Sequence, residues 1–161
     1  MKYEDEFKAE PVQIALPQVE IHAAKDMGDR VWGTELLIAE GPGYIGKLMY
    51  MDAGKAGGLQ SHVEKHETSY LLSGRAWVYT DTGDGALSKF QIGPGTSVRI
   101  PPGAVHKVEA IEDCCFFEAS TPHFNDRVRL EAKYGRTDTD GLPTTRDFAI
   151  GDRPMDLEYI G

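Results

Sequence analysis

The chain has 161 residues, enough for one domain with a single sizeable core. Its formal net charge of −9 argues against nucleic acid and anionic membrane surfaces as partners. No stretch is long and apolar enough for a membrane span, and the acidic first residues lack the features of a secretory signal. We therefore expect a cytoplasmic protein. The adjacent Cys114 and Cys115, which are unsuited to a disulfide with each other, fit a reducing compartment.

Residues 1–28 are expected to form an extended N-terminal arm with edge-strand pieces, because prolines such as Pro11 and Pro17 break its short apolar runs. Such an arm could pack on its own domain or on a neighbouring subunit. The segment from Pro11 to Ile21 cannot close a barrel alone. We therefore expect it to contribute to the contact of a homodimer or larger assembly.

Residues 29–136 read as a series of short strands separated by turns. The 18 glycines and nine prolines of the chain favour many turns, as in an all-β sandwich or barrel. Strands are expected at residues 35–39, 46–52, 67–73, 75–80, 87–92, 97–100, 104–111 and 114–119.

Two further segments follow these strands. The stretch from Asn125 to Tyr134 has weak helical spacing, and Gly135 is placed to end a helix there. Residues 137–161 are polar and form an expected C-terminal extension, either a lid strapped over the barrel or a disordered tail. Apolar side chains such as Phe148 and Ile160 favour the packed alternative.

Two glycine-framed segments carry a plausible ligand set for a divalent metal: Gln60, His62, Glu67 and His106. Side chains two apart on a strand share a face, so Gln60 and His62 can converge. Glu67 has the wrong parity for the same straight strand, which predicts a turn between them. His106 follows a Pro-Pro-Gly turn and arrives from a distant strand.

These segments resemble the two motifs of the cupin family. His62, Glu67 and Gly74 fit the first motif, with Gln60 where its first histidine usually stands. In the second motif, Gly95, Pro101, Gly103 and His106 fit, and Ala110 replaces the final Asn. The resemblance implies a single cupin barrel, a jelly roll or double-stranded β-helix, with a divalent ion such as Zn, Fe, Mn or Ni.

A wider resemblance, over about residues 30 to 136, is to the cupin part of type II mannose-6-phosphate isomerases. It rests on Arg30-Val-Trp-Gly, on Lys47, on Leu-Gln60-Ser-His62 and on the Asp126-to-Arg136 segment with its Tyr-Gly-Arg end. The departures fall around the ligands: Lys65 replaces an arginine, and Thr68-Ser69 replaces His-Trp.

Three residues are candidates for catalysis: Glu118, Lys47 and Lys65. Glu118 lies in an apolar run, so it either faces the barrel cavity as a general base with a raised pKa or faces solvent at a strand end. Lys47 could bind a substrate oxyanion or be a solvated strand-end lysine. Lys65 can carry a point charge where the isomerase resemblance has arginine, but not a bidentate fork.

Three functions fit these residues. The first is a metal-dependent sugar or sugar-phosphate isomerase acting on a small carbohydrate substrate, as the isomerase resemblance implies. The second is an Fe(II)-dependent dioxygenase, because two histidines and one carboxylate form the facial set of such enzymes. The third is a non-catalytic metal-binding or sugar-binding module.

Overall fold

The computed structural model describes residues 18–124 and 126–135, and this part of the chain is nearly all β-structure. Its elements, in chain order, are β1 (Lys25–Arg30), β2 (Gly33–Gly41), β3 (Tyr44–Met51), β4 (Gln60–His62), β5 (Glu67–Ser73), β6 (Ala76–Asp81), β7 (Leu87–Ile92), β8 (Ser97–Ile100), β9 (His106–Ala110), β10 (Cys114–Ser120), β11 (Arg127–Arg129) and the 3₁₀ helix η1 (Ala132–Tyr134).

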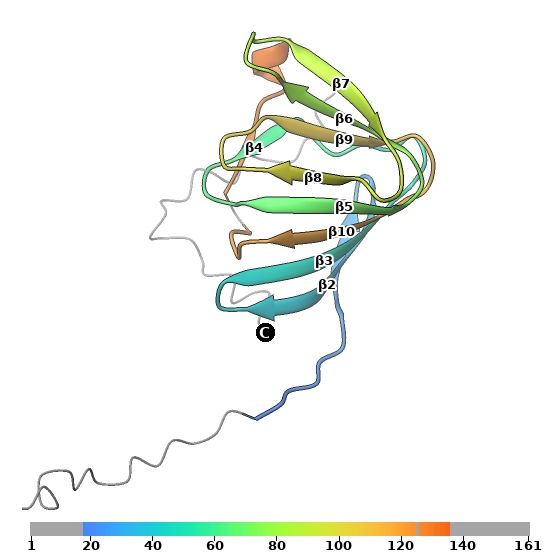
Figure 1. The fold of residues 1–161 in the computed structure, drawn as a ribbon, viewed down its shortest axis with the longest axis vertical. Coiled ribbons are helices and arrows are strands. Elements are labelled where there is room, and N and C mark those ends of the chain that lie inside the picture. The colour runs from blue at the N-terminus through green and yellow to red at the C-terminus, as the bar shows by residue number, and fades with distance from the viewer. Residues whose placement is uncertain (1–17, 125, 136–161) are drawn as a thin grey trace, which may run out of the picture.

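The strands form two antiparallel sheets that enclose a barrel (Figure 1). One sheet has the order β1-β2-β3-β10-β5-β8 and the other the order β11-β4-β9-β6-β7. Side chains from both sheets line one cavity. The expected all-β jelly-roll barrel is therefore confirmed.

The inner face of the six-stranded sheet changes from apolar to polar along its strands. Paired residues in adjacent antiparallel strands lie on the same face, and so does every second residue along a strand. One row pairs Phe116 with Leu71, and two residues further along β10 the next row pairs Glu118 with Lys47 and with Ser69. The register thus places a polar row directly beside an apolar one, and the polar row lines the cavity.

The apolar rows form the hydrophobic core. Its buried members are Met51, Leu71, Ala76, Ala110, Cys114 and Phe116, with Trp32, Met49, Ile92 and Val108 packed against them. Phe116 and Met51 also line the cavity, so the core forms part of the cavity wall. Burying each such side chain contributes about 1.5–3 kcal/mol to the stability of the fold, and this burial holds the two sheets together where the core lies.

Strand β1 begins at Lys25 and is an edge strand of the six-stranded sheet, inside the segment expected to be an extended arm with edge-strand pieces. One segment differs from the sequence-based expectation. The stretch expected to be helical contains strand β11, which pairs with β4, and only Ala132–Tyr134 is helical. Backbone pairing with β4 outweighed the weak helical spacing there. Gly135 ends the short helix in a left-handed conformation, φ 65°, as expected.

Most of the expected arm and the expected C-terminal extension at 137–161 lie outside the described residues. Among the residues that are described, no helix has the length and apolarity needed to cross a membrane.

Candidate metal centre and its cavity

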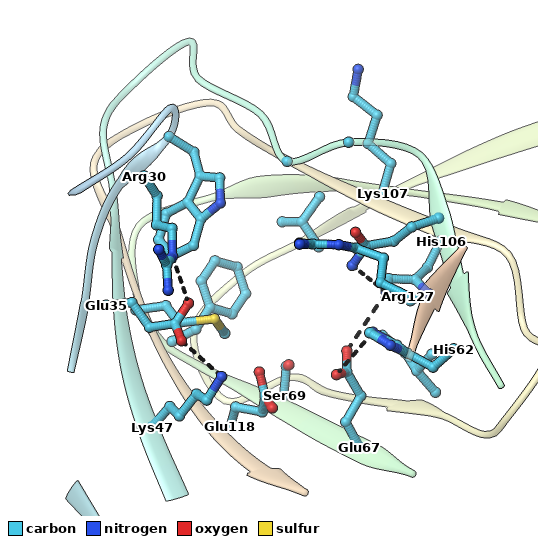
Figure 2. A pocket seen from close by; sticks show the side chains of 18 of the residues that line it. Arg30, Glu35, Lys47, His62, Glu67, Ser69, His106, Lys107, Glu118 and Arg127 are labelled. Atoms are coloured by element: carbon cyan, nitrogen blue, oxygen red, sulfur yellow. Dashed lines mark hydrogen bonds and ion pairs between the residues drawn. The ribbon is translucent and has the colours of Figure 1, made fainter. Parts of the chain in front are cut away.

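A cavity of about 330 Å³ opens between the two sheets (Figure 2). The six-stranded sheet contributes Glu35, Lys47 and Glu118, while the five-stranded sheet contributes His62 and His106. Every residue expected from the sequence to bind metal or act in catalysis lines this cavity. The structure therefore brings together residues that lie up to 71 positions apart, from Lys47 to Glu118.

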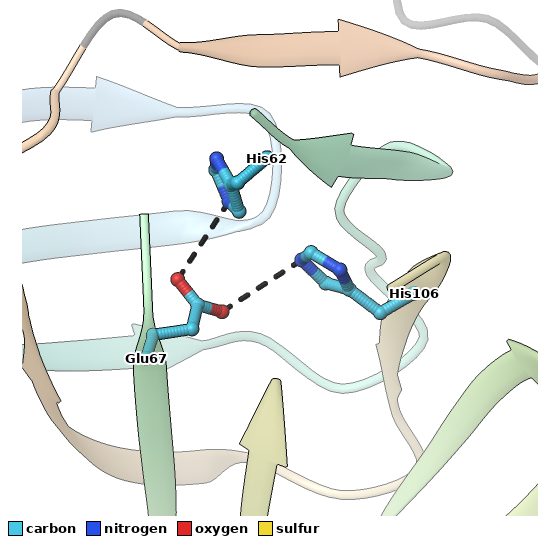
Figure 3. A group of neighbouring side chains, drawn as sticks. All are labelled: His62, Glu67 and His106. Carbon is cyan, nitrogen blue, oxygen red and sulfur yellow. Dashed lines mark ion pairs between the residues drawn. The ribbon is translucent and has the colours of Figure 1, made fainter. Parts of the chain in front are cut away.

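His62, Glu67 and His106 form the one group of potential metal ligands found among the described residues (Figure 3). Their ligand atoms all lie within 4.8 Å of one another, and all three residues are buried. The Nε2 atom of His62 is 3.6 Å from Glu67 Oε2, and the Nε2 atom of His106 is 3.7 Å from Glu67 Oε1. These three side chains converge, as the sequence predicts.

The hydrogen bonds of both imidazoles direct Nε2 toward the centre of this group. The Nδ1–H of His62 donates to Asp126 Oδ1 at 2.8 Å, and the Nδ1–H of His106 donates to the Ala104 carbonyl at 3.0 Å. Each proton on Nδ1 leaves a lone pair on Nε2. Burial lowers the pKa of His106, which keeps that imidazole neutral. Two imidazoles that each turn Nε2 toward one carboxylate are a donor set that fits a divalent metal ion.

Gln60 lies beside the group, on the same strand as His62. Its side-chain nitrogen is 3.3 Å from His106 Nε2, so the amide donates to the lone pair that faces the ligand group. A half-turn about the last side-chain bond exchanges the amide nitrogen and oxygen, which brings the oxygen to the same place. Gln60 therefore lies within reach of the ligand group, and its role as a fourth and weaker ligand stays a prediction.

Asp126 is a functional residue that the sequence analysis missed. It is almost completely buried, at 1% exposure. Its Oδ1 accepts from His62, and its Oδ2 accepts from the backbone N–H groups of Glu64 and Lys65 at 2.7 and 2.6 Å. Burial alone would raise the pKa of Asp126, but these hydrogen-bond donors lower it by more, so that the net pKa is about 2. A single carboxylate thus fixes both the His62 ring and the bend that leads to Glu67.

Lys65 and Glu118 form a buried ion pair next to the ligand group. The ammonium of Lys65 lies 2.5 Å from Glu67 Oε2 and 2.5 Å from Glu118 Oε1, so it bridges the two carboxylates. Burial alone would lower the pKa of Lys65, but Glu118 and Glu67 raise it above its usual range. Lys65 is therefore fully charged at neutral pH.

Glu118 faces the cavity, but its pKa is shifted in the direction opposite to the expected one. Burial alone would raise the pKa, as the apolar sequence around it suggested. Lys65 and Lys47 more than offset burial, and Ser120 Oγ donates to Glu118 Oε1 at 2.7 Å. The carboxyl is held below its usual pKa range, so the expectation of a raised pKa is wrong. Glu118 is ionised at neutral pH.

Lys47 is buried, not solvated, and it belongs to a second charged cluster across the cavity. Its ammonium is 2.7 Å from Glu35 Oε1, and Arg30 Nε is 3.3 Å from Glu35 Oε2. Burial raises the pKa of Glu35, while Lys47 and Arg30 lower it, with the net result below the usual value. Sequence analysis missed Glu35, although its two partners belonged to the isomerase resemblance.

The cavity carries an excess of positive charge, in contrast to the chain as a whole, whose net charge is −9. Among the described residues, six cationic side chains and three carboxylates line it. The cations are Arg30, Lys47, Lys65, Lys107, Arg127 and Arg129, and the carboxylates are Glu35, Glu67 and Glu118. A locally positive cavity attracts small anions even in an acidic protein.

Part of the chain matches a known protein family. Residues 47–119 match the family described as Cupin domain. This segment contains all four proposed ligands and the three proposed catalytic residues. No curated protein matches the chain.

Several solved structures share the fold. KdgF from Halomonas sp. has a TM-score of 0.54 and 19% identity, over 64% of this chain and 90% of its own. A Bacillus subtilis oxalate decarboxylase with Mn(II) centres has a TM-score of 0.56 and 21% identity, over 66% of this chain and 30% of its own. CapF has a TM-score of 0.59 and 17% identity, over 68% of this chain and 35% of its own.

This chain therefore spans about a third of the length of the decarboxylase and of CapF. At these identities the likeness shows a common fold and no more. Residues 47–119 match the cupin domain family, and the solved structures share the barrel.

Proposed function

We propose that this protein is a metal-dependent isomerase that interconverts the aldose and ketose forms of a small, negatively charged sugar. The observation that carries the proposal is the ionised carboxylate of Glu118, held by Lys65 next to the ligand group of His62, Glu67 and His106. An isomerase needs a base and a cation at adjacent positions of one substrate, and the cavity offers both.

The ligand group supports a divalent ion in this role. His62, Glu67 and His106, with Gln60 as a weaker fourth ligand, would hold the ion. An ion bound there would supply a Lewis acid that polarises a carbonyl group. The Mn(II) centres of the oxalate decarboxylase show that one protein of this fold uses such an ion.

The residues around the ligand group would move the proton. Glu118 would take the proton from C2 of the open-chain aldose and return it to C1, while a proton passes between the O2 and O1 oxygens. Lys65 would donate a hydrogen bond to the oxygen on which negative charge develops. Lys47 is the cross-strand partner of Glu118 in the sheet. It would stabilise the same negative charge from the other side of the substrate.

The charge of the cavity supports an anionic sugar, such as a sugar phosphate. Arg30 and Lys47 lie on one wall, and Arg127 lies near His106 on the other (Figure 2). Cations on both walls allow one end of an extended substrate to lie at the ligand group while its anionic end pairs with a guanidinium or ammonium.

Isomerisation in D₂O tests this proposal. The metal-loaded protein is incubated with a panel of aldoses and aldose phosphates, and deuterium at C1 or C2 is measured by mass spectrometry. A Glu118→Gln variant should keep its metal and lose exchange. A Glu112→Gln variant, which removes a carboxylate from an exposed pair with Arg75, is the matched control and should retain exchange.

The facial set of two histidines and one carboxylate favours a second candidate, an Fe(II)-dependent dioxygenase. An oxygen electrode separates the two. Oxygen uptake by the Fe(II)-loaded protein, with no deuterium exchange on any sugar of the panel, would reject the isomerase and favour the dioxygenase. If neither deuterium exchange nor oxygen uptake is observed, the remaining function is that of a non-catalytic binding module.

A further inference from the structure

The buried ammonium of Lys65 lies between two carboxylates that project from neighbouring strands of the six-stranded sheet. Glu67 begins β5, and its cross-strand partner on β10 is Ser120. Glu118 precedes Ser120 by two residues, so Glu67 and Glu118 are diagonal neighbours on one face of the sheet (Figure 2). Without the ammonium between them, the two negative charges would repel each other in the interior of the barrel.

Glu67 is also a proposed metal ligand, and Lys65 holds one of its two oxygens. The Oε2 atom is 2.5 Å from the ammonium of Lys65 and 3.6 Å from His62 Nε2. The Oε1 atom faces His106 Nε2 at 3.7 Å (Figure 3). A metal ion held by the two imidazoles therefore meets a carboxylate that is already paired with a buried cation. A divalent ion and an ammonium on the same carboxylate repel each other.

The ammonium of Lys65 has a second partner to which it can move. Its Nζ atom is also 2.5 Å from Glu118 Oε1, so an ammonium that leaves Glu67 stays paired with Glu118. The backbone N–H of Lys65 donates to Asp126 Oδ2 at 2.6 Å, which fixes the main chain and leaves only the side chain to move. Displacing Lys65 from Glu67 thus breaks one contact and leaves no unpaired charge buried.

We propose that Lys65 is an internal cation that competes with the metal ion for Glu67. The ammonium leaves Glu67 when the ion binds, and it then stays on Glu118 alone. Every divalent ion has to overcome the same pair of Lys65 and Glu67, so Lys65 lowers the affinity of the site for all of them. Ions that bind imidazole weakly, such as Mg²⁺, leave Lys65 in place.

The competition also prepares the cavity for a ligand. An ammonium has three N–H donors, and Lys65 lines the cavity, so the donor released from Glu67 becomes available to a ligand oxygen. The inference rests on the proposed ligand group of His62, Glu67 and His106, and it does not depend on the isomerase activity.

Metal affinity tests the proposal, with Zn²⁺ as the probe and a chelator as the competitor. Lys65→Met removes the charge and should bind Zn²⁺ at least about 10-fold more tightly than the wild type. Lys65→Arg keeps the charge and should stay within about threefold of the wild type. Lys47→Met removes the same charge from the same cavity, but Lys47 pairs with Glu35, so its gain should be at least about threefold smaller than that of Lys65→Met. A purely structural role of Lys65 predicts weaker binding, so a Lys65→Met affinity equal to or below the wild-type value refutes the competition.

A double-mutant cycle locates the competition on one carboxylate. In a Glu67→Gln background the gain from Lys65→Met should shrink at least about threefold, because the contested carboxylate is absent. An undiminished gain contradicts the proposal.

A crystal structure of the Zn²⁺-loaded wild-type protein requires no substitution and so does not depend on how well any variant folds. It should show the Lys65 ammonium on Glu118 and out of hydrogen-bond reach of Glu67. An ammonium still on Glu67 overturns the proposal. A wild-type protein that binds no Zn²⁺ refutes both the ligand group and the competition, whereas isomerase activity enters none of these measurements.

Discussion

Replacing Asp126 with Asn should change the protonation of a metal ligand without removing any ligand. The carboxylate accepts on both oxygens, from His62 on one and from the backbone N–H groups of Glu64 and Lys65 on the other. Asparagine has one oxygen and one NH₂ group. The oxygen must stay with the two backbone donors, which cannot reverse their role, so the NH₂ group faces His62.

The His62 ring then has to accept at Nδ1 and carry its proton on Nε2, which removes the lone pair that points toward Glu67. Changes to such outer partners typically cost 10–100-fold in metal affinity, and we expect a loss of about that size here. Loss of a buried, charge-assisted hydrogen bond should also lower the free energy of unfolding by about 1.5–3 kcal/mol.

Three measurements check this reasoning. Competition with a chelator gives the metal affinity, urea unfolding of the metal-free protein gives the stability, and ¹⁵N NMR shows which His62 nitrogen carries the proton. Asp113→Asn is the control, because Asp113 accepts from the backbone N–H of Ala53 in an exposed position. An Asp126→Asn variant with wild-type affinity and the proton still on Nδ1 would refute the argument.

Other substitutions separate the roles of single groups. His106→Ala should abolish stoichiometric metal by elemental analysis, whereas Gln60→Ala should retain part of it; full occupancy in His106→Ala would contradict the ligand assignment. Glu35→Gln leaves the buried Lys47 and the half-buried Arg30 without their carboxylate and should cost about 3 kcal/mol at neutral pH by urea unfolding. Because folding lowers the pKa of Glu35, its stabilisation is present above the ordinary pKa of about 4.3 and is lost as the pH falls through the lowered value, so the difference from wild type should vanish in acid. Gly58→Ala places a methyl group against a buried guanidinium and should cost about 1–3 kcal/mol, while Gly57→Ala, whose methyl group meets nothing nearer than 4.0 Å, should cost less than about 1 kcal/mol.

The barrel and the ligand group could be predicted because their signals are local in the sequence. Glycine and proline mark the turns, strand alternation marks the faces, and His62, Glu67 and His106 stand at fixed offsets from those turns. The wrong parity of Glu67 even predicted the bend after His62. That bend is present, and the Asp126 carboxylate accepts from its backbone.

The electrostatics of the cavity could not be predicted in the same way, because they depend on contacts between distant segments. Asp126 meets His62 across 64 residues, and nothing near Asp126 in the sequence indicates that it is buried. Glu118 appeared to be a carboxyl in an apolar run, so a raised pKa was expected. Its cationic neighbours Lys47 and Lys65 come from other segments, and they reverse the sign of the shift.

The proposed ligands come from both sheets: His62 on β4 and His106 on β9 belong to the five-stranded sheet, and Glu67 on β5 belongs to the six-stranded sheet. A bound ion is therefore a cross-link between the two sheets of the barrel. Its binding free energy adds to the stability of the whole fold, by about 2.7 kcal/mol when the free ion is at 100 times its dissociation constant. Thermal unfolding thus becomes a measure of occupancy that requires no substrate: ions that fit the site raise the melting temperature in the order of their affinities.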